Sequence, residues 1–227
     1  GGGPAVVPGK PLPNEYKEEN LELLQRGLAN LTAHLGIVQR FGIPAVVAIN
    51  AFPTDTQAEW DLIRKTAIQA GASAAVVSHH WEKGGEGAAE LAAAVEKACE
   101  EPKQFRYLYE LNQSLSAKIE TIAQQVYGAD GVDYSDESRE TLEKLESDGF
   151  GALPICMAKT QYSLSHDPAL KGAPKGWRLP IREVRLAAGA GFVYPLCGDM
   201  TTMPGLPSKP AFMGIDIDER GKITGLS

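Results

Sequence analysis

Cysteine is scarce in this sequence, and the cysteines that occur are not paired. The 227 residues include three of them, Cys99, Cys156 and Cys197, with no CxxC spacing. This pattern excludes a disulfide framework and a zinc knuckle, and it favours a reducing, cytoplasmic setting. The chain is nevertheless long enough to bury a sizeable hydrophobic core.

Long apolar runs and an excess of basic charge are also missing. No apolar run reaches the length of a membrane span, so we expect no membrane partner. Lys and Arg number 22 against 29 Asp and Glu, and the formal net charge of −7 argues against non-specific nucleic-acid binding. The chain starts Gly1-Gly2-Gly3-Pro4 without an initiator Met or a signal peptide, so we expect a piece of a longer protein.

Several well-known catalytic motifs are absent as well. The sequence has no Ser-His-Asp pattern, no HExxH zinc motif and no Walker A phosphate loop. The glycines at residues 1–3 are followed by neither a helix start nor Lys-Ser/Thr, which favours a linker over a phosphate loop. A reaction therefore does not follow from these motifs.

The stretch at residues 43–56 is the most informative part of the chain. It begins as a short apolar run rich in Val and Ile, which is typical of a strand buried on both faces in a parallel sheet. Polar residues follow, and open α/β sheets bind ligands at the carboxyl ends of their strands. Asn50, Phe52 and Asp55 are therefore candidate site residues. Position alone favours a Phe52 that fills the end of a neighbouring helix, and a Phe52 that points into a cleft is the alternative.

Helices and strands alternate in the first hundred residues. The apolar spacing predicts a helix over residues 14–40 with N-cap Asn14, a strand over 43–49, a helix from Thr54 or Asp55 to Ala70, a strand over 74–77 and a helix over 86–100. This order is the repeating unit of a parallel α/β sheet. Right-handed crossovers would place Phe52 and Trp81 at one sheet edge, where they could sandwich a flat heterocycle. Two unrelated core aromatics are the alternative.

The residues around Trp81 suggest two further kinds of site, and the simpler interpretation is favoured for each. His79 and His80 are adjacent, and adjacent strand residues point to opposite faces, so we expect no metal site here. The glycine-rich residues 84–87 could present backbone N–H groups to an anion. A tight turn is the favoured alternative.

The rest of the chain divides at Pro102 and Gly149. The pattern predicts a helix over residues 111–126, a helix over 136–148 capped by Ser135, strands over 155–158, 179–186 and 192–196, and a terminal hairpin over 215–223. We therefore predict three parts: an α/β segment with the aromatic cleft over 1–101, a helical connecting segment over 102–150, and an α+β segment with Gly/Pro loops over 151–227.

Four motifs, taken together and in order, resemble one enzyme family. They are INAFPTDT at residues 49–56, HWEKGGEG at 80–87, LPICMAKTQYS at 153–163 and TMPGLP at 202–207. The chain is similar over its whole length to the C-terminal part of formate–tetrahydrofolate ligase, and it covers less than half of the usual length of that family. The resemblance implies an α/β fold with parallel-sheet layers of P-loop-NTPase-like or Rossmann-like kind. A smaller α+β C-terminal domain follows, and the whole is a fragment of a larger fold.

The resemblance also implies an activity. The family joins formate to tetrahydrofolate with ATP and magnesium, through formyl phosphate. Its N-terminal portion carries the phosphate-binding loop and most formyl-phosphate contacts, so ATP and Mg would be bound mainly outside this chain. We expect tetrahydrofolate, formate and ATP as partners, a homo-oligomer for the full-length protein, and an isolated chain that is inactive.

Site residues follow from the same resemblance. The aromatics that match Phe52 and Trp81 hold the folate ring system in the family, with Pro53 and Val77 nearby. The loop that matches Pro174, Lys175 and Gly176 lies near the nucleotide base, although the family more often has Thr at the position of Lys175.

Two further assignments concern polar groups. Asn50 follows its strand as an Asn that orients a nucleotide base or loop would. Lys159 could assist with charge at the phosphate, and a structural or surface lysine is the alternative.

Two other functions stay open at this point. A non-catalytic folate-binding or partner-binding module would have the same motifs without the phosphate-loop half of the ligase. A nucleotide-binding α/β domain of other chemistry would share the helix–strand order but not the four motifs. An upstream segment with a Gly-rich loop ending in Lys-Ser/Thr would favour the ligase over the module, and its absence would favour the module.

Overall fold

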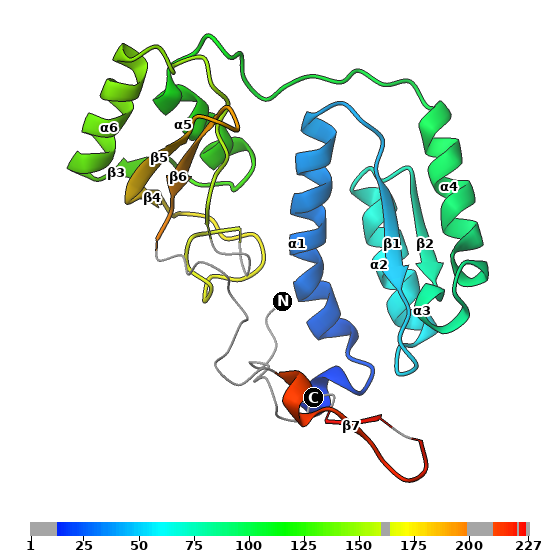
Figure 1. Cartoon of the computed structure of the whole chain (residues 1–227). Coiled ribbons are helices and arrows are strands. Elements are labelled where there is room, and N and C mark those ends of the chain that lie inside the picture. Colours follow the sequence, from blue (N-terminus) through cyan, green and yellow to red (C-terminus); the bar gives the residue numbers. More distant parts are fainter. Residues whose placement is uncertain (1–12, 160–163, 199–210, 222, 226–227) are drawn as a thin grey trace.

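A computed structural model describes residues 13–159, 164–198, 211–221 and 223–225 (Figure 1). The glycines at residues 1–3, residues 160–163 of the third motif and the motif at 202–207 lie outside the described residues. The helices and strands, in chain order, are η1 Asn14–Tyr16, α1 Leu21–Arg40, β1 Val46–Asn50, α2 Gln57–Gln69, β2 Ala74–Ser78, α3 His80–Lys83, η2 Glu86–Ala88, α4 Ala89–Glu100, α5 Leu115–Gln125, β3 Val132–Tyr134, α6 Asp136–Ser147, β4 Leu179–Ile181, β5 Glu183–Ala187, β6 Phe192–Leu196, η3 Ala211–Gly214, β7 Asp216–Ile217 and β8 Ile223–Thr224. None of the helices in the described ranges is both long and apolar enough to cross a membrane.

The first unit of the fold is a parallel strand pair with helices around it. Strands β1 and β2 run parallel, as predicted, and α1, α2 and α4 surround the pair (Figure 1). Small and branched apolar side chains fill the space between them, and the buried ones are Leu35, Ala45, Ile49, Ala67, Ala72 and Ala75. The alternation of helix and strand that the sequence predicted is therefore confirmed for this unit.

Two helices have other N-cap residues than the sequence suggested. Asn20, not Asn14, caps α1, because its side-chain oxygen accepts a hydrogen bond from the backbone N–H of Leu23 at 2.9 Å. Asn14 instead starts a separate 3₁₀ turn. Thr56, not Thr54 or Asp55, caps α2, and it forms a reciprocal capping box with Glu59.

Strand β1 is less buried than its sequence suggested. Of its five residues only Ile49 is buried, whereas Ala48 and Asn50 are exposed, so the prediction of burial on both faces is wrong. Within the described residues this sheet has two strands, so β1 is an edge strand and lacks a neighbour on one side.

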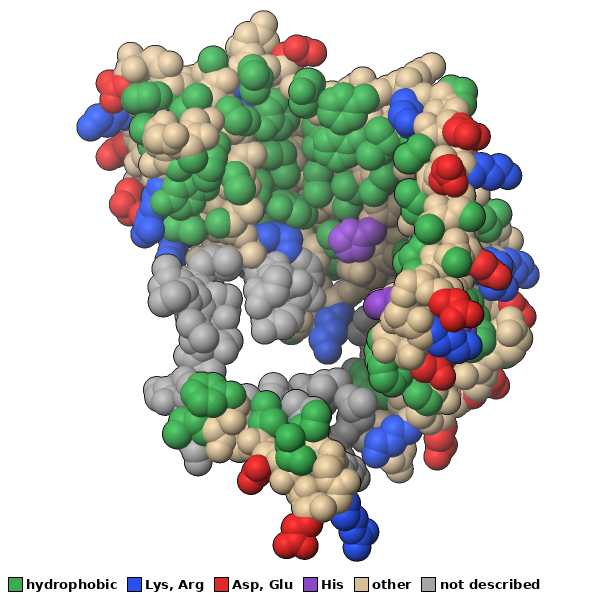
Figure 2. All heavy atoms as spheres, turned by 45° about the vertical axis from the view of Figure 1, so that its right-hand side comes forward, with side chains coloured by type: hydrophobic (Ala, Val, Ile, Leu, Met, Phe, Trp, Pro, Cys, Tyr) green, Lys and Arg blue, Asp and Glu red, His purple; other side chains and the backbone are tan. Residues whose placement is uncertain are grey.

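An extended linker joins the first unit to the second and is fixed at both ends. The backbone N–H of Gln104 donates to the carbonyl oxygen of Gly42 at 3.0 Å, after the end of α1. Further along, the hydroxyl oxygen of Tyr109 accepts from the N–H of Ile155 at 3.0 Å. Apolar side chains gather on the upper part of the face in Figure 2, and Phe105, Tyr107 and Leu111 of the linker are exposed.

The second unit has its own core. Helices α5 and α6 pack on the parallel pair β3–β4 and the antiparallel hairpin β5–β6. The predicted strand over 155–158 forms only isolated bridges to β6, and the predicted strand over 179–186 is interrupted at Arg182, where β4 ends and β5 begins. Both α5 and α6 lie within the predicted connecting segment 102–150, and the three-part division of the chain stays a prediction.

A buried lysine fixes the segment that enters the second unit. Lys118 of α5 is fully buried, and its Nζ donates to the carbonyl oxygens of Gly151 at 2.6 Å and Leu153 at 3.1 Å. Burial lowers the pKa of Lys118, and the carboxylate of Glu146 opposes that shift. The two accepting carbonyls hold residues 151–153 against α5.

Replacing Gly42 by Ala should destabilise the chain more than replacing Gly149 by Ala. Both glycines have positive φ, 68° and 89°, so each Ala costs about 1–3 kcal/mol of backbone strain. A side chain at position 42 would also overlap the carbonyl oxygen of Gln104, whereas nothing lies within 4 Å of one at position 149. Urea unfolding of both variants measures the difference, and equal losses would contradict the docking of the linker at Gly42.

Candidate functional site

Two loops that each carry an aromatic residue leave the same edge of the first sheet. In the parallel register Asn50 lies opposite Ser78, so the carboxyl ends of β1 and β2 coincide. Phe52 lies in the loop after β1, which ends at Asn50, and Trp81 lies in α3, shortly after the end of β2 at Ser78. The predicted placement of both aromatics at one edge is confirmed, and we call Phe52 and Trp81 the aromatic rim.

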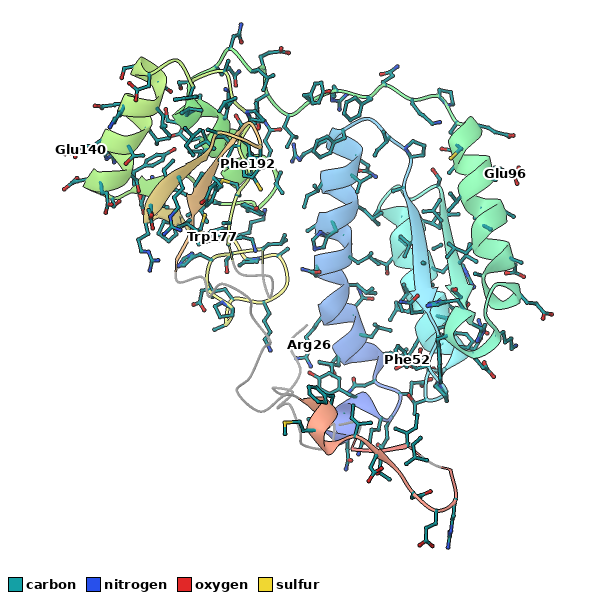
Figure 3. The ribbon with its side chains drawn as sticks, in the orientation of Figure 1. Arg26, Phe52, Glu96, Glu140, Trp177 and Phe192 are labelled. Atoms are coloured by element: carbon teal, nitrogen blue, oxygen red, sulfur yellow. The ribbon has the colours of Figure 1, made fainter. Side chains whose placement is uncertain are left out.

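The aromatic rim is exposed, and its two loops contact each other. The indole N–H of Trp81 donates to the carbonyl oxygen of Ala51, the residue before Phe52, at 3.0 Å. Phe52 is 60% and Trp81 59% exposed. The favoured expectation for Phe52, a plug at the end of a helix, is therefore wrong, because its ring projects beyond the strand end rather than under a helix. Figure 3 shows its position beyond the end of β1.

The loop after β1 has little conformational freedom. The carboxylate of Asp55 accepts a hydrogen bond from the backbone N–H of Phe52 at 2.8 Å, which closes a tight turn. Glu59 accepts from the N–H of Thr56 at 3.0 Å and from that of Asn20 at 3.4 Å. These bonds hold the loop from both sides, so Phe52 is presented from an ordered backbone.

The loop after β2 folds back on its own strand. The N–H of His79 donates to the carbonyl oxygen of Gly87 at 2.9 Å, and a side chain at position 87 would lie 2.5 Å from the carbonyl oxygen of His79. Gly84 has a φ of 60°, which favours glycine. The glycines therefore allow the tight turn that the sequence favoured, and that turn places Trp81 beside Ala51.

The two histidines at this edge have different partners. His80 Nδ1 lies 3.1 Å from the hydroxyl of the fully buried Ser78, and His79 Nδ1 lies 3.7 Å from the carboxylate of Glu82. In the part of the chain that the structure describes, no three His, Cys, Asp or Glu side chains gather closely enough to hold a metal ion.

The other residues assigned to folate and nucleotide lie in different places. Asn50 and Pro53 are at the strand edge with the aromatic rim, and both are exposed. Val77 is half-buried and packs against the first core. The structure thus brings Asn50 together with the residues that the resemblance assigned to folate, rather than with the loop at residues 174–176.

The loop at residues 174–176 lies on the other side of α1, near Trp177 in Figure 3. The side-chain amide of Asn30 in α1 donates to the carbonyl oxygen of Gly172 at 3.1 Å, which docks this loop on the helix. Pro174, Lys175 and Arg40 help to line a cavity of about 190 Å³. Gly176 has a φ of 74°, so its backbone turns sharply there.

Lys159 belongs to the edge of the second core. Its Nζ lies 5.2 Å from the centroid of the Tyr127 ring, and burial lowers the pKa of Lys159. Burial raises the pKa of Tyr127 to about 12 and the pKa of the neighbouring Cys197 thiol to about 12. Lys159 therefore lies over the Tyr127 ring at the edge of the second core and is not part of the aromatic rim.

A larger apolar cavity lies away from the aromatic rim. Its volume is about 660 Å³, and it lies between the linker and the second unit. Aromatic and aliphatic side chains line it, Glu110 being the charged residue among them. It contains none of the residues that the sequence assigned to a site.

Comparison with known proteins identifies the family. The sequence profile described as "Formate–tetrahydrofolate ligase" matches residues 2–227. The chain belongs to the formate–tetrahydrofolate ligase family. The "Formate–tetrahydrofolate ligase" of Desulfovibrio desulfuricans is 56% identical over 228 residues, which cover 100% of this chain and 38% of that protein.

Longer relatives match as well. The "C-1-tetrahydrofolate synthase, cytoplasmic" of Schizosaccharomyces pombe is 52% identical over 228 residues, and the "C-1-tetrahydrofolate synthase, mitochondrial" of Saccharomyces cerevisiae is 49% identical over 226. Each match covers 100% of this chain but only 24% and 23% of those proteins. The chain thus spans about a quarter to two fifths of the length of these relatives. One of the two synthases is named as cytoplasmic and the other as mitochondrial.

Two contacts that organise the site in this family member were not predicted from its sequence. Trp60 occupies a position of apolar helical spacing in α2, yet its indole N–H donates to Asp55 at 3.4 Å. The Trp81–Ala51 bond joins a side chain to a backbone carbonyl, which no residue pattern records. The Thr56-x-x-Glu59 spacing was a readable capping-box signal that locates the start of α2.

Cys197 should resist alkylation in the folded chain at pH 8. It is 2% exposed, whereas Cys99 and Cys156 are exposed, so the Cys99→Ser/Cys156→Ser variant isolates it. Iodoacetamide should label this variant only after denaturation, as mass spectrometry would detect. Rapid labelling of the native variant would contradict the buried, protonated thiol.

The same thiol should make stability fall at high pH. Its pKa is raised from the ordinary 9.0 to about 12, so the folded state holds the proton more tightly than the unfolded state does. The resulting contribution to stability is complete below pH 9 and is lost as the pH rises toward 12. Comparing Cys197→Ala with the parent across this range tests the sign, since the variant should lose less stability.

Proposed function

We propose that this chain supplies the folate-binding part of an ATP-dependent ligase that forms 10-formyltetrahydrofolate from formate and tetrahydrofolate. The observation that carries the proposal is the aromatic rim at the shared carboxyl end of β1 and β2, with the Trp81 indole bonded to the Ala51 carbonyl. Membership of the formate–tetrahydrofolate ligase family supports it.

The aromatic rim suits a pterin. A pterin is flat, so two aromatic side chains can offer faces to it, and such contacts contribute about 0.5–1.5 kcal/mol beyond burial. Its edge carries donors and acceptors, and polar groups of Asn50 and the backbone lie at the same strand ends. Pro53 and Val77 would flank the ring as apolar neighbours. The rim is already exposed, so little rearrangement would precede binding.

The contribution to catalysis would be positioning. ATP and formate would give formyl phosphate and ADP, and the folate amine would attack the formyl carbon, so that phosphate leaves and the amine loses a proton. Holding the amine in place converts this attack into a reaction between bound groups and requires no base from this chain.

Nucleotide and phosphate contacts are proposed at three places. Pro174, Lys175 and Gly176 would lie near the nucleotide base, and Asn50 would orient the base or a loop. Lys159 would supply positive charge at the phosphate. The described residues assemble no acidic cluster suited to magnesium, so no step is assigned to the metal in this chain.

The architecture of the whole ligase is proposed in the same way. We propose that β1 and β2 belong to a larger parallel sheet of Rossmann-like or P-loop-NTPase-like kind, because β1 is an edge strand and two strands alone are marginally stable. We also propose a cytoplasmic, homo-oligomeric ligase, with ATP and magnesium bound mainly by residues that this chain does not contain.

Replacing Trp81 by Ala should weaken tetrahydrofolate binding by about tenfold or more, because a stacking face and its buried area are lost. Isothermal titration of the chain measures the effect. Phe105→Ala is the matched control, since Phe105 is equally exposed but lies in the linker against Phe41. Unchanged folate affinity in the Trp81 variant, or an equal loss in the Phe105 variant, would remove the support for this site.

A further inference from the structure

Trp60 contacts both loops that carry the aromatic rim. From α2, its indole N–H donates to Asp55 Oδ2 at 3.4 Å, in the loop after β1. Its ring also meets the imidazole of His79, directly after β2, edge to face, with centroids 5.8 Å apart and planes at 89°. One half-buried side chain thus lies between two loops that are joined in sequence only through α2 and β2.

Asp55 transmits this contact to Phe52. Its Oδ2 atom accepts both the Trp60 indole N–H and the backbone N–H of Phe52, the latter at 2.8 Å. A single oxygen therefore links the side chain of Trp60 to the backbone that presents Phe52. Loss of that oxygen would leave the turn from Phe52 to Asp55 with only its backbone bond, in which the Asp55 N–H donates to the Phe52 carbonyl at 3.0 Å.

His79 transmits the contact to Trp81. The carbonyl oxygen of His79 accepts from the N–H groups of Lys83 at 2.9 Å and Glu82 at 3.1 Å, which are the bonds that form α3. Trp81 lies within this short helix. A shift of His79 would therefore move Trp81, whose indole is bonded to Ala51 on the other loop.

We propose that Asp55 and Trp60 are positioning residues that couple the two loops and so set the separation of Phe52 and Trp81. This inference rests on the proposed folate site for its functional consequence. The separation of the two aromatic side chains decides whether a flat ring, such as a pterin, fits between them in contact with both. Neither residue needs to touch the ligand for this role, because both act through the backbone of the loops.

The first test follows the coupling without a ligand. The chain has three Trp residues, and each indole N–H is hydrogen-bonded: Trp60 to Asp55, Trp81 to Ala51 and Trp177 to Pro174 in the second unit. In ¹H–¹⁵N spectra, Asp55→Ala should shift the indole signals of Trp60 and Trp81 and leave that of Trp177 in place.

Two further variants sharpen this test. Asp61→Ala is the matched control. Asp61 lies in α2, the helix that carries Trp60, and its exposed carboxylate pairs with Arg64. It should leave the Trp60 and Trp81 signals unchanged. Trp60→Phe keeps a ring beside His79 but lacks the donor, and it should also shift the Trp81 signal. An unshifted Trp81 signal in both Asp55→Ala and Trp60→Phe would overturn the coupling.

The second test measures tetrahydrofolate affinity by titration. Asp55→Ala should weaken binding about tenfold, which equals about 1.4 kcal/mol. Asp55→Asn should restore most of it, because both bonds reach one oxygen and an amide oxygen can accept them. A loss in Asp55→Asn as large as in Asp55→Ala would overturn the positioning role, since it would indicate a direct need for the charge.

These outcomes separate the inference from the proposed function. If Trp81→Ala lowers folate affinity and Asp55→Ala does not, the positioning role is wrong and the folate site stands. If Trp81→Ala has no effect, the folate site is wrong, and the indole signals alone decide whether Asp55 couples the loops. Thermal unfolding of each variant, expected to match the parent within a few degrees, separates positioning from loss of the fold.

Discussion

The parallel register of β1 and β2 is the constraint on which the site depends. Because Asn50 pairs with Ser78, both strands end at the same level, and the loops that follow begin side by side. A shift of one residue would turn every side chain of one strand to the opposite face and separate the loops. The hydrogen bond from the Trp81 indole to the Ala51 carbonyl can form only because both strands end at the same height. It in turn joins the two loops.

The rest of the first unit supports that register. The capping box at Thr56 and Glu59 fixes where α2 begins, and α2 carries Trp60 to a position between the loops. Small residues such as Ala67 and Ala75 in the core let α2 approach the strands closely. The aromatic rim is therefore a product of helix capping and close packing within the first unit, whereas the second unit has a core of its own.

Much of this arrangement was predictable from residue patterns, and the exceptions have physical reasons. An apolar run that ends in polar residues indicates a strand end, so the shared edge of Phe52 and Trp81 followed from helix–strand alternation. The exposure of much of β1 did not follow from the sequence. A run rich in Val and Ile looks the same whether the strand has a neighbouring strand on one side or on both. The prediction of Asn14 as N-cap was also wrong, because the same residue type stands at position 20 and only the backbone decides which Asn caps α1.

The residues assigned to the nucleotide show a different limit. Asn50 and the loop at residues 174–176 are far apart in sequence, and no spacing rule relates them. Strand β1, which ends at Asn50, and the loop before Trp177 lie on different sides of α1 (Figures 1 and 3). Their roles depended on resemblance alone and stay proposals. The Asp55–Trp60 contact escaped prediction because a helical Trp at an apolar position is usually assigned to the core, while its indole N–H needs a partner that only the fold supplies.

The central claim is that the aromatic rim is a preformed folate site. Calorimetric titration of the unaltered chain with tetrahydrofolate, with and without ATP and magnesium, tests it most directly. The account predicts saturable binding of one folate per chain in the micromolar to low-millimolar range, without turnover, under both conditions. Absence of binding by a chain that circular dichroism shows to be folded would contradict it.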